Sequence, residues 1–456
     1  MSAREQLVDR TRLQGLIASE RAEFAERNAV SKQHFEAADE HLWTGVPMAW
    51  MAKWPGGFPL SMVGARGARV VDVDGHEYID FCLGDTGAMA GHSAPATVAA
   101  VERRAAELGG ITTMLPTEDA TWVAGDLAKR FGLPQWSFTL SATDANRFAL
   151  RKARQLTGRP LVLCFSWCYH GSVDETVVVL AADGARSRPG NVGPAVDPTE
   201  TTRVCEFNDL EAVERLLADR QVACVITEPA LTNIGIVLPE PGFMEGLREL
   251  TRQTDTLLII DETHTLSAGP GGCTKAWGLD PDIVTIGKAI GGGIPIGAYG
   301  MSAAVAEQLK ADEDADFIDT GGVGGTLAGN ALSLAAAHGT LDEVLTASAF
   351  ERMEALATRF TAGVDAAIER YGAPWVCVQL GARTEYRFMP EAPRNGGESA
   401  AADDPELDEW LHLYMLNRNI LMTPFHNMAL ICPTTTEADV DRHSELFDRA
   451  LASLFG

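Results

Sequence analysis

The sequence has few basic residues and no long apolar run. It carries 37 lysines and arginines against 63 aspartates and glutamates, which gives a net charge of −26. This excess of negative charge repels phosphate backbones and anionic lipid headgroups. No segment approaches the roughly 20 consecutive apolar residues that a membrane-spanning helix needs, and the charged N-terminal region does not read as a secretory signal. We therefore expect neither nucleic acid nor a membrane among its partners.

Several common cofactor and metal motifs are also missing. There are eight cysteines but no CxxC pair, so a zinc ribbon or a dithiol redox motif is not expected, and no metal site is predicted. No GxGxxG dinucleotide fingerprint follows a strand-like segment. Most cysteines lie in apolar surroundings, where buried, reduced thiols are expected. Reduced thiols are typical of the cytoplasm, which is the predicted location.

What the sequence does contain is a regular alternation of strand and helix patterns. Between about residues 120 and 300, short apolar runs alternate with helical stretches, as at 222–227, 256–261 and 282–287. This alternation predicts an α/β fold with a largely parallel sheet covered by helices. Short polar motifs follow the runs, and ligands of such sheets bind beyond the carboxyl ends of the strands. The functional site is therefore expected at that edge.

Three regions are predicted from these patterns. Residues 1–65 form a helical and irregular segment that joins the smaller domain, residues 66–335 form the large domain, and residues 336–456 form a smaller α+β domain. Asp74-Gly75, between two alternating runs, predicts a hairpin in which both turn residues have positive φ. Residues 374–388 read as a single strand.

Lys288 is the first candidate for chemistry, because it stands between the apolar run 282–287 and three glycines. A phosphate-binding GxxxxGK[ST] loop is excluded, since Asp282 and Ala289 occupy positions that the motif reserves for glycine and a hydroxyl. A surface lysine would leave the neighbouring strand ends unexplained. The third interpretation is an amine that forms an imine with a carbonyl cofactor, activated by desolvation or by nearby cations.

Pyridoxal phosphate would need a partner for each of its polar groups. Its ring nitrogen stays protonated beside a buried carboxylate, for which Asp261 at the end of an apolar run is the candidate. Its phosphate favours backbone N–H groups at a helix start, which the turn 141–145 supplies. The segment 321–330 offers a second glycine-rich anion site. Tyr169 and Thr263 are placed to cover the two ring faces.

The remaining partner is a donor for the phenolic oxygen of the ring, and Asn233 is available for it. Taken one at a time, a strand-terminal aspartate is more often a cap, and a lone asparagine is more often a turn residue. The joint occurrence of these residues is what favours the cofactor site.

These motifs resemble those of the class III aminotransferases of fold type I, near the branch that contains glutamate-1-semialdehyde aminomutase. The similarity covers about residues 45–450. The matching family motifs are SGTEA, CYHG, EPxxxNxG, the DE pair, GKxxGGGxPxGAxG and AGTLxGN, at residues 141–145, 168–171, 228–235, 261–262, 287–300 and 324–330.

The resemblance implies a fold type I enzyme dependent on pyridoxal phosphate, with a mixed, mostly parallel sheet in the large domain. Lys288 would be the Schiff-base lysine and proton shuttle, and Asp261 would pair with the ring nitrogen. The other implied cofactor-binding residues are Ala142 and Thr143 at the phosphate, Tyr169 and Thr263 on the ring faces, Asn233 at the phenolic oxygen, and Glu228, His170 and His264 nearby.

Two further residues implied by the resemblance belong to the neighbouring subunit's site. Thr326, with Gly325, would reach the phosphate of that subunit, so a homodimer is expected. For His170 and His264 a supporting role is expected rather than a direct catalytic one.

The predicted activity is a ping-pong transamination between an amine or amino acid and an oxo acid or ketone. The alternatives are a glutamate-1-semialdehyde-type aminomutase, a racemase, or a non-enzymatic binding protein. Three departures from the aminomutases argue against the first alternative. They are Ala49 in place of an arginine, the stretch 423–430 without an acidic residue, and the linker 312–322.

Substrate preference is predicted only broadly. An apolar pocket around Trp43, Trp50, Met51 and Trp54 would suit an aryl or alkyl amine or a β-amino acid. Arg383 and Arg387 lie on one face of a strand. One of them is expected to bind a substrate carboxylate, or both belong to an exposed charge ladder.

Overall fold

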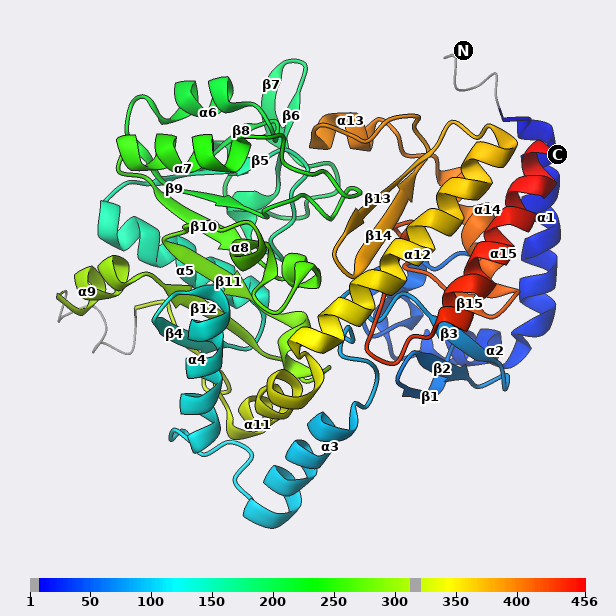
Figure 1. Ribbon diagram of the computed structural model, residues 1–456, viewed down its shortest axis with the longest axis horizontal. Helices are drawn as coiled ribbons and strands as arrows, with labels where there is room; N and C mark the ends of the chain where they lie inside the picture. Colours follow the sequence, from blue (N-terminus) through cyan, green and yellow to red (C-terminus); the bar gives the residue numbers. More distant parts are fainter. Residues whose placement is uncertain (1–7, 312–320) are drawn as a thin grey trace. The chain divides into compact units, whose positions relative to one another are not determined.

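The computed structural model describes residues 8–311 and 321–456, and these divide into two compact units (Figure 1). The large unit comprises residues 94–350 and 393–401. The small unit comprises the chain up to residue 93 together with residues 351–392 and 402–456. Residues 312–320 of the linker 312–322, which differs from the aminomutase pattern, lie outside the described residues.

A seven-stranded sheet forms the centre of the large unit (Figure 1). Its strands are, in spatial order, β4 (Gln135–Thr139), β12 (Gly297–Met301), β11 (Ile283–Ile286), β10 (Leu257–Asp261), β9 (Val222–Thr227), β5 (Leu161–Phe165) and β8 (Thr202–Cys205). β12 is antiparallel to both of its neighbours, whereas the pairs from β11 to β8 are parallel. The predicted mixed, mostly parallel sheet is thus confirmed.

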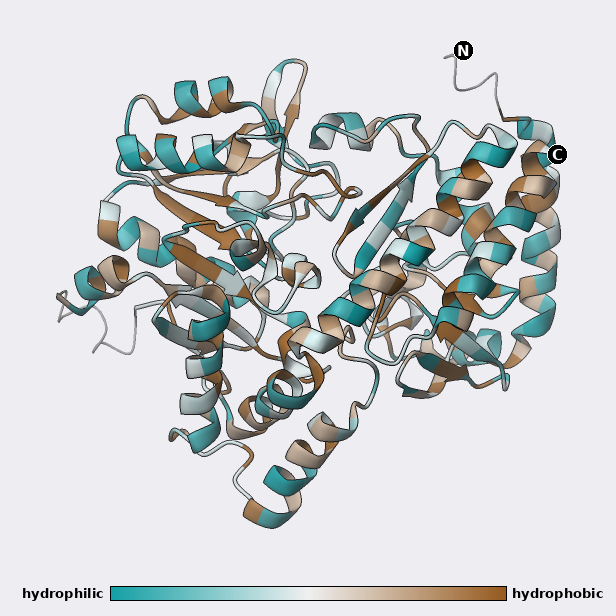
Figure 2. Ribbon diagram, viewed as in Figure 1, coloured by the Kyte–Doolittle hydropathy of each residue, from teal (hydrophilic) through white to brown (hydrophobic). Residues whose placement is uncertain are grey.

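The central strands are apolar along their whole length, because both faces of such a sheet are covered. All six residues of β9 are buried, and Figure 2 shows β9 and β10 in the brown of hydrophobic residues. Helix α5 (Ala142–Thr157) packs against β4, β9, β11 and β12. Ser141 begins α5 by accepting a hydrogen bond from Asp144 N, and Gly158 ends it in the left-handed conformation.

Other helices and one hairpin complete the large unit. α4 packs on β4, α7 packs on β10 and α6, and α11 packs on α3 and α4. The bounds are α3 (Pro95–Glu102), α4 (Glu118–Phe131), α6 (Leu210–Leu217), α7 (Phe243–Gln253), α8 (Gly272–Ala276), α9 (Ala303–Ala311), α11 (Ala331–Gly339), α13 (Gly396–Ala400), and the hairpin β6 (Val178–Ala181) with β7 (Gly184–Ser187).

The small unit contains two further sheets. In the first, β1 (Met62–Arg66), β2 (Arg69–Asp72) and β3 (Glu77–Asp80) are antiparallel, and β15 (Ile420–Leu421) pairs with β3 in parallel. The hairpin at Asp74-Gly75 is confirmed, although only Gly75 of the two has positive φ. The second sheet is antiparallel, in the order β13 (Val376–Leu380), β14 (Arg383–Arg387), β16 (Met428–Leu430).

Five helices accompany these sheets: α1 (Arg10–Arg27), α2 (Ala29–Ala38), α12 (Ala347–Tyr371), α14 (Pro405–Leu416) and α15 (Glu437–Phe455). α1 packs on α14, and its buried side chains include Leu13, Ile17 and Phe24. Among the described residues no helix is long and apolar enough to cross a bilayer.

The predicted domain boundaries differ from the two units at three places. Residues 66–93 belong to the small unit, because β3 pairs with β15 and Phe58, Val70 and Tyr78 share one core cluster with Leu413 and Leu421. Residues 336–350 and 393–401 belong to the large unit. These pairings join segments more than 300 residues apart in sequence, which a boundary drawn from local patterns does not capture.

Residues 374–388 form two strands rather than the single strand predicted. Gly381, with φ of 58°, allows the chain to turn between β13 and β14. Arg383, Glu385 and Arg387 share one face of β14, and all three are buried. The prediction of an exposed charge ladder was therefore wrong, and Arg383 donates a hydrogen bond to Thr86 at 2.5 Å.

The aromatic segment 43–54 does not act as one apolar lining. Trp54 packs on the core cluster of the small unit, whereas Trp43 is 86% exposed. Trp50 is partly exposed and meets Phe425 edge-on at 5.9 Å. Its role in a substrate pocket stays a prediction.

The fold predicts an acid-sensitive core at His443. Its ring is buried and stacks on Phe360 at 4.0 Å, and neither ring nitrogen has a hydrogen-bond partner in the described structure. Burial lowers the pKa of His443 to about 3. Below pH 6.5 His443 therefore takes up a proton in the unfolded chain but stays neutral in the folded protein. The free energy of unfolding consequently falls as the pH falls from 6.5 toward 3.

His443→Phe keeps the stack and removes this titration. We expect the variant to lose about 2 kcal/mol less stability than the wild type between pH 7.5 and pH 5, as measured by urea unfolding. The exposed His41→Gln serves as the control. Parallel pH profiles for His443→Phe and the wild type would contradict the expectation.

Candidate active site

Most of the predicted site residues meet at the carboxyl edge of the large-unit sheet. Asp261 is the last residue of β10, Glu228 follows β9, and Lys288 follows β11. Ala142 and Thr143 are the first two residues of α5, which begins after β4. Because these strands run in the same direction, their carboxyl ends share one edge, as the sequence predicts.

Asp261 is the best-anchored group of the site. It is 3% exposed, and both of its carboxylate oxygens are held. Oδ2 accepts a hydrogen bond from Asn146 Nδ2 at 2.8 Å and lies 2.9 Å from His170 Nδ1. Oδ1 accepts from the backbone N–H of Thr263 at 3.0 Å and from its hydroxyl at 2.6 Å. Burial alone would raise the pKa of Asp261, but His170 and these donors hold it below its usual range, so the carboxylate stays charged.

Asn146 is a buried partner of Asp261 that the sequence motifs do not include. Its Nδ2 also donates to the backbone carbonyl of His170 at 3.0 Å, and its Oδ1 accepts from Thr285 Oγ1 at 2.5 Å. The signal in the sequence was a polar residue among the mostly apolar buried positions of α5, beside Ala145 and Ala149. Asn146 ties α5 to the ends of two strands.

His170 is a buried partner of Asp261. Burial lowers the pKa of His170, but the neighbouring Cys168 and Asp261 outweigh it and raise the value well above normal. The ring thus favours the protonated form that donates to the carboxylate. The supporting role of His170 at the cofactor stays a prediction.

Lys288 extends toward a second histidine. It has φ of 49° and opens a short 3-10 turn, Lys288–Gly291. Its Nζ lies 2.9 Å from His264 Nε2. The sequence predicts only a supporting role for His264, and the structure places it in direct contact with the predicted catalytic amine.

The glycines around Lys288 are required by close packing. A Cβ on Gly287 would lie 2.9 Å from the Cβ of Ala142, and one on Gly297 would lie 2.3 Å from the carbonyl oxygen of Ser141. Both positions therefore admit the start of α5 only because they lack a side chain. The same holds for Gly171, whose Cβ would lie 2.1 Å from Thr143 Oγ1.

The start of α5 can hold an anion. The N–H groups of the first helical residues have no carbonyl partner within the helix, and they carry the positive end of the helix dipole. Thr143 Oγ1 accepts a hydrogen bond from Ser172 N at 3.3 Å, which joins this turn to the loop after β5. A phosphate cradle, a charged carboxylate and an amine are the three partners that pyridoxal phosphate requires, so the residues present fit the cofactor.

The other predicted residues are less constrained by the structure. Tyr169 is 43% exposed and Asn233 is half-buried, so both are accessible. Thr263 donates hydrogen bonds to Asp261. The predicted position of Thr263 beneath the cofactor ring stays a prediction. Gly325 and Thr326 lie in an exposed segment.

Comparison with known proteins identifies the family. The sequence profile described as aminotransferase class-III matches residues 50–377. The chain belongs to the class III aminotransferases. A glutamate-1-semialdehyde 2,1-aminomutase from Chloroflexus aggregans is 36% identical over 446 residues, which cover 94% of this chain and 99% of that protein. The class III enzymes depend on pyridoxal phosphate, so the predicted fold, family and cofactor are confirmed.

Two solved structures are informative. A glutamate-1-semialdehyde-aminomutase from Pseudomonas aeruginosa, in complex with PMP, is 49% identical, with a TM-score of 0.96 and coverage of 98% of this chain and 100% of that chain. An omega-transaminase from Sphaerobacter thermophilus is 30% identical, with a TM-score of 0.83 and coverage of 93% and 97%.

Glu228 gives this site a pH-dependent stability. It is fully buried, its Oε2 accepts from Thr232 Oγ1, and its Oε1 has no hydrogen-bond partner among the described residues. Burial raises the pKa of Glu228 to about 7. Between about 4.5 and 7 the folded protein therefore keeps a proton that the unfolded chain releases, and stability is lost as the pH rises through this window.

Glu228→Gln keeps the shape and the Thr232 contact but does not titrate. We expect the variant to match the wild type at pH 4.5 and to exceed its free energy of unfolding by about 3 kcal/mol at pH 8. Urea unfolding midpoints across this range measure the difference, with the exposed Glu214→Gln as the control. A constant difference between variant and wild type at all pH values would disprove the assignment.

Proposed function

We propose that this chain is an aminomutase that moves an amino group between adjacent carbons of one amino-aldehyde substrate, of the glutamate-1-semialdehyde type. The observation that carries the proposal is the similarity to the Pseudomonas aeruginosa aminomutase, at 49% identity over 98% of the chain. The Chloroflexus aggregans aminomutase supports it. In such a reaction the substrate supplies both the amine and the carbonyl, so no external acceptor is needed.

Each residue of the site has a separate role in the proposed reaction. Pyridoxal phosphate, when bound, supplies the carbonyl that takes up the amino group and a ring that spreads negative charge. Asp261 stays charged and favours a protonated ring nitrogen. Lys288 moves a proton at the carbon that bears the nitrogen, and His264 Nε2, 2.9 Å from Nζ, orients the amine. The first N–H groups of α5 bind the phosphate.

Intermolecular transamination is the second candidate. The similarity to the omega-transaminase favours it, as does Ala49 where the aminomutases carry an arginine. Without that arginine, a substrate carboxylate needs another cation. The aminomutase is preferred because the more similar of the two solved structures bears that name.

A single-substrate assay separates the two candidates. Cofactor-loaded protein is mixed with glutamate-1-semialdehyde and no oxo acid, and products are followed by chromatography. We expect the isomer with the amino group on the terminal carbon, and a rate lower by on the order of 10³-fold in Lys288→Ala. If the substrate is converted only after an oxo acid is added, and a second amino acid is released, the protein is a transaminase and the aminomutase proposal is wrong.

We further propose a homodimer in which Thr326 completes the neighbouring phosphate site. Thr326 is exposed, and so are nearby large apolar side chains of the large unit that a second copy would cover. These are Leu108, Ile111, Met114, Leu115 and Leu327.

The eight free cysteines, of which seven are buried, support a reducing, cytoplasmic location.

Mixed dimers test the role of Thr326. Lys288→Ala and Thr326→Ala are expected to be poorly active alone, because one lacks the amine and the other a phosphate contact. A co-expressed heterodimer contains one site with Lys288 from one subunit and Thr326 from the other. We therefore expect activity to return to about half the wild-type value per dimer, measured on tag-purified heterodimers. Activity no higher than in Thr326→Ala homodimers would place Thr326 in its own subunit's site or outside both.

A further inference from the structure

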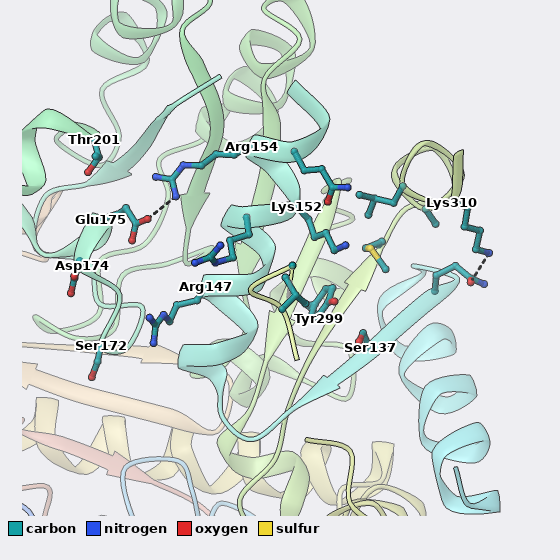
Figure 3. Close-up of a pocket in the computed structure, with 18 of the residues that line it drawn as sticks. Ser137, Arg147, Lys152, Arg154, Ser172, Asp174, Glu175, Thr201, Tyr299 and Lys310 are labelled. Atoms are coloured by element: carbon teal, nitrogen blue, oxygen red, sulfur yellow. Dashed lines mark hydrogen bonds and ion pairs between the residues drawn. The ribbon is translucent and has the colours of Figure 1, made fainter. Parts of the chain in front are cut away.

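A large cavity in the large unit is lined by residues of α5, β12 and α9. Its volume is about 1170 Å³, and neither Asp261 nor Lys288 lines it. Figure 3 shows α5 along the cavity, with Arg147, Lys152 and Arg154 drawn from this helix and Lys310 reaching from the far side. Arg151 also lines it. The cavity therefore gathers five cationic side chains in a chain whose net charge is −26.

The carboxylates of the lining do not cancel this charge. Among the described residues that line the cavity, Asp174 and Glu175 are the acidic ones. Glu175 is engaged by Arg154, at 2.6 Å between Oε1 and Nη1 (Figure 3). Among the described residues of the lining, Arg147, Arg151 and Lys310 then outnumber Asp174, so this part of the wall is positive.

Arg147 and Arg151 form the exposed part of the cationic wall. They are four residues apart on α5, so their side chains share one helix face, and both are exposed. Like charges at this spacing destabilise a helix by about 0.2–0.5 kcal/mol, so the pair favours an anion that neutralises it. Lys310 Nζ donates a hydrogen bond to Gln135 Oε1 at 3.0 Å.

Part of the remaining wall is apolar. Tyr299 and Met301 of β12 line the cavity, together with Ala306 and Leu309 of α9. In Figure 3, Tyr299 lies between α5 and the edge of the sheet. An inorganic anion would leave this wall uncovered, and the volume lies slightly above the range of about 300–1,000 Å³ common for drug-sized organic ligands, so there is room for an organic group. The lining thus combines a cationic side with an aromatic and aliphatic side.

We propose that this cavity is a second ligand site, separate from the cofactor site, that binds an organic phosphate. Arg147 and Arg151 hold the phosphate oxygens, because the guanidinium fork matches a multiply charged oxyanion. Lys310 adds a point charge from the opposite side. Tyr299 and Leu309 contact the organic part of the ligand.

Isothermal titration calorimetry on the cofactor-saturated enzyme tests the site. The probes are AMP, ATP and fructose 1,6-bisphosphate, with adenosine and inorganic phosphate as partial ligands. We expect at least one organic phosphate to bind with Kd below about 1 mM, at least tenfold more tightly than either partial ligand. Affinity should fall with rising salt.

The double variant Arg147→Gln/Arg151→Gln should weaken this binding at least tenfold, whereas Arg215→Gln, an exposed arginine of α6, should leave it unchanged. Lys310→Gln provides a second variant on another helix, and circular dichroism checks that each variant is folded. No binding by any organic phosphate, or binding unaffected by both Arg147/Arg151 and Lys310 variants, would overturn the proposal.

Two other outcomes would also overturn it. Equal affinity for inorganic phosphate would reduce the cavity to a general anion site. Loss of the dimer in sedimentation of the double variant, without a change in ligand affinity, would make the cationic wall a contact between copies of the chain.

Discussion

The buried carboxylate of Asp261 is the constraint on which the rest of the site depends. A charged group at the end of a central strand is costly to bury unless donors surround it. Here Asn146, His170 and Thr263 supply them from α5, from the loop after β5 and from the chain directly after β10. Satisfying one carboxylate therefore positions three segments of the large unit relative to the sheet edge.

The same requirement explains the glycines of the site. If α5 is to bring Asn146 to Asp261, its first turn must lie directly against the ends of β11 and β12. Gly287 and Gly297 make this approach possible, since side chains there would collide with Ala142 and Ser141. Close packing therefore explains both glycines.

Charge is distributed unevenly over the large unit. Asp261 and Glu228 are both buried at the sheet edge, and burial by itself raises the pKa of each carboxyl group. Donors keep Asp261 ionised, whereas Glu228, with a single hydroxyl partner, holds its proton to about pH 7. Two carboxyl groups of similar burial thus have different pKa values, because Asp261 has more hydrogen-bond donors than Glu228 and one of them is the charged ring of His170. The cationic wall of α5 is a separate feature on another side of the same helix.

Local patterns in the sequence determined the strands, the mostly parallel sheet, and the positions of Asp261, Lys288 and the turn at 141–145. Each of these depends on residues close together in the chain: an apolar run, a terminal acid, a helix cap. The family motifs identified the cofactor for the same reason. The tertiary structure alone decided the contact of His264 with Lys288, the role of Asn146 and the burial of Arg383, Glu385 and Arg387. It also decided that residues 66–93 join the small unit, through the pairing of β3 with β15. These features depend on segments distant in sequence meeting in space, and a polar side chain shows its partner only when that meeting has occurred.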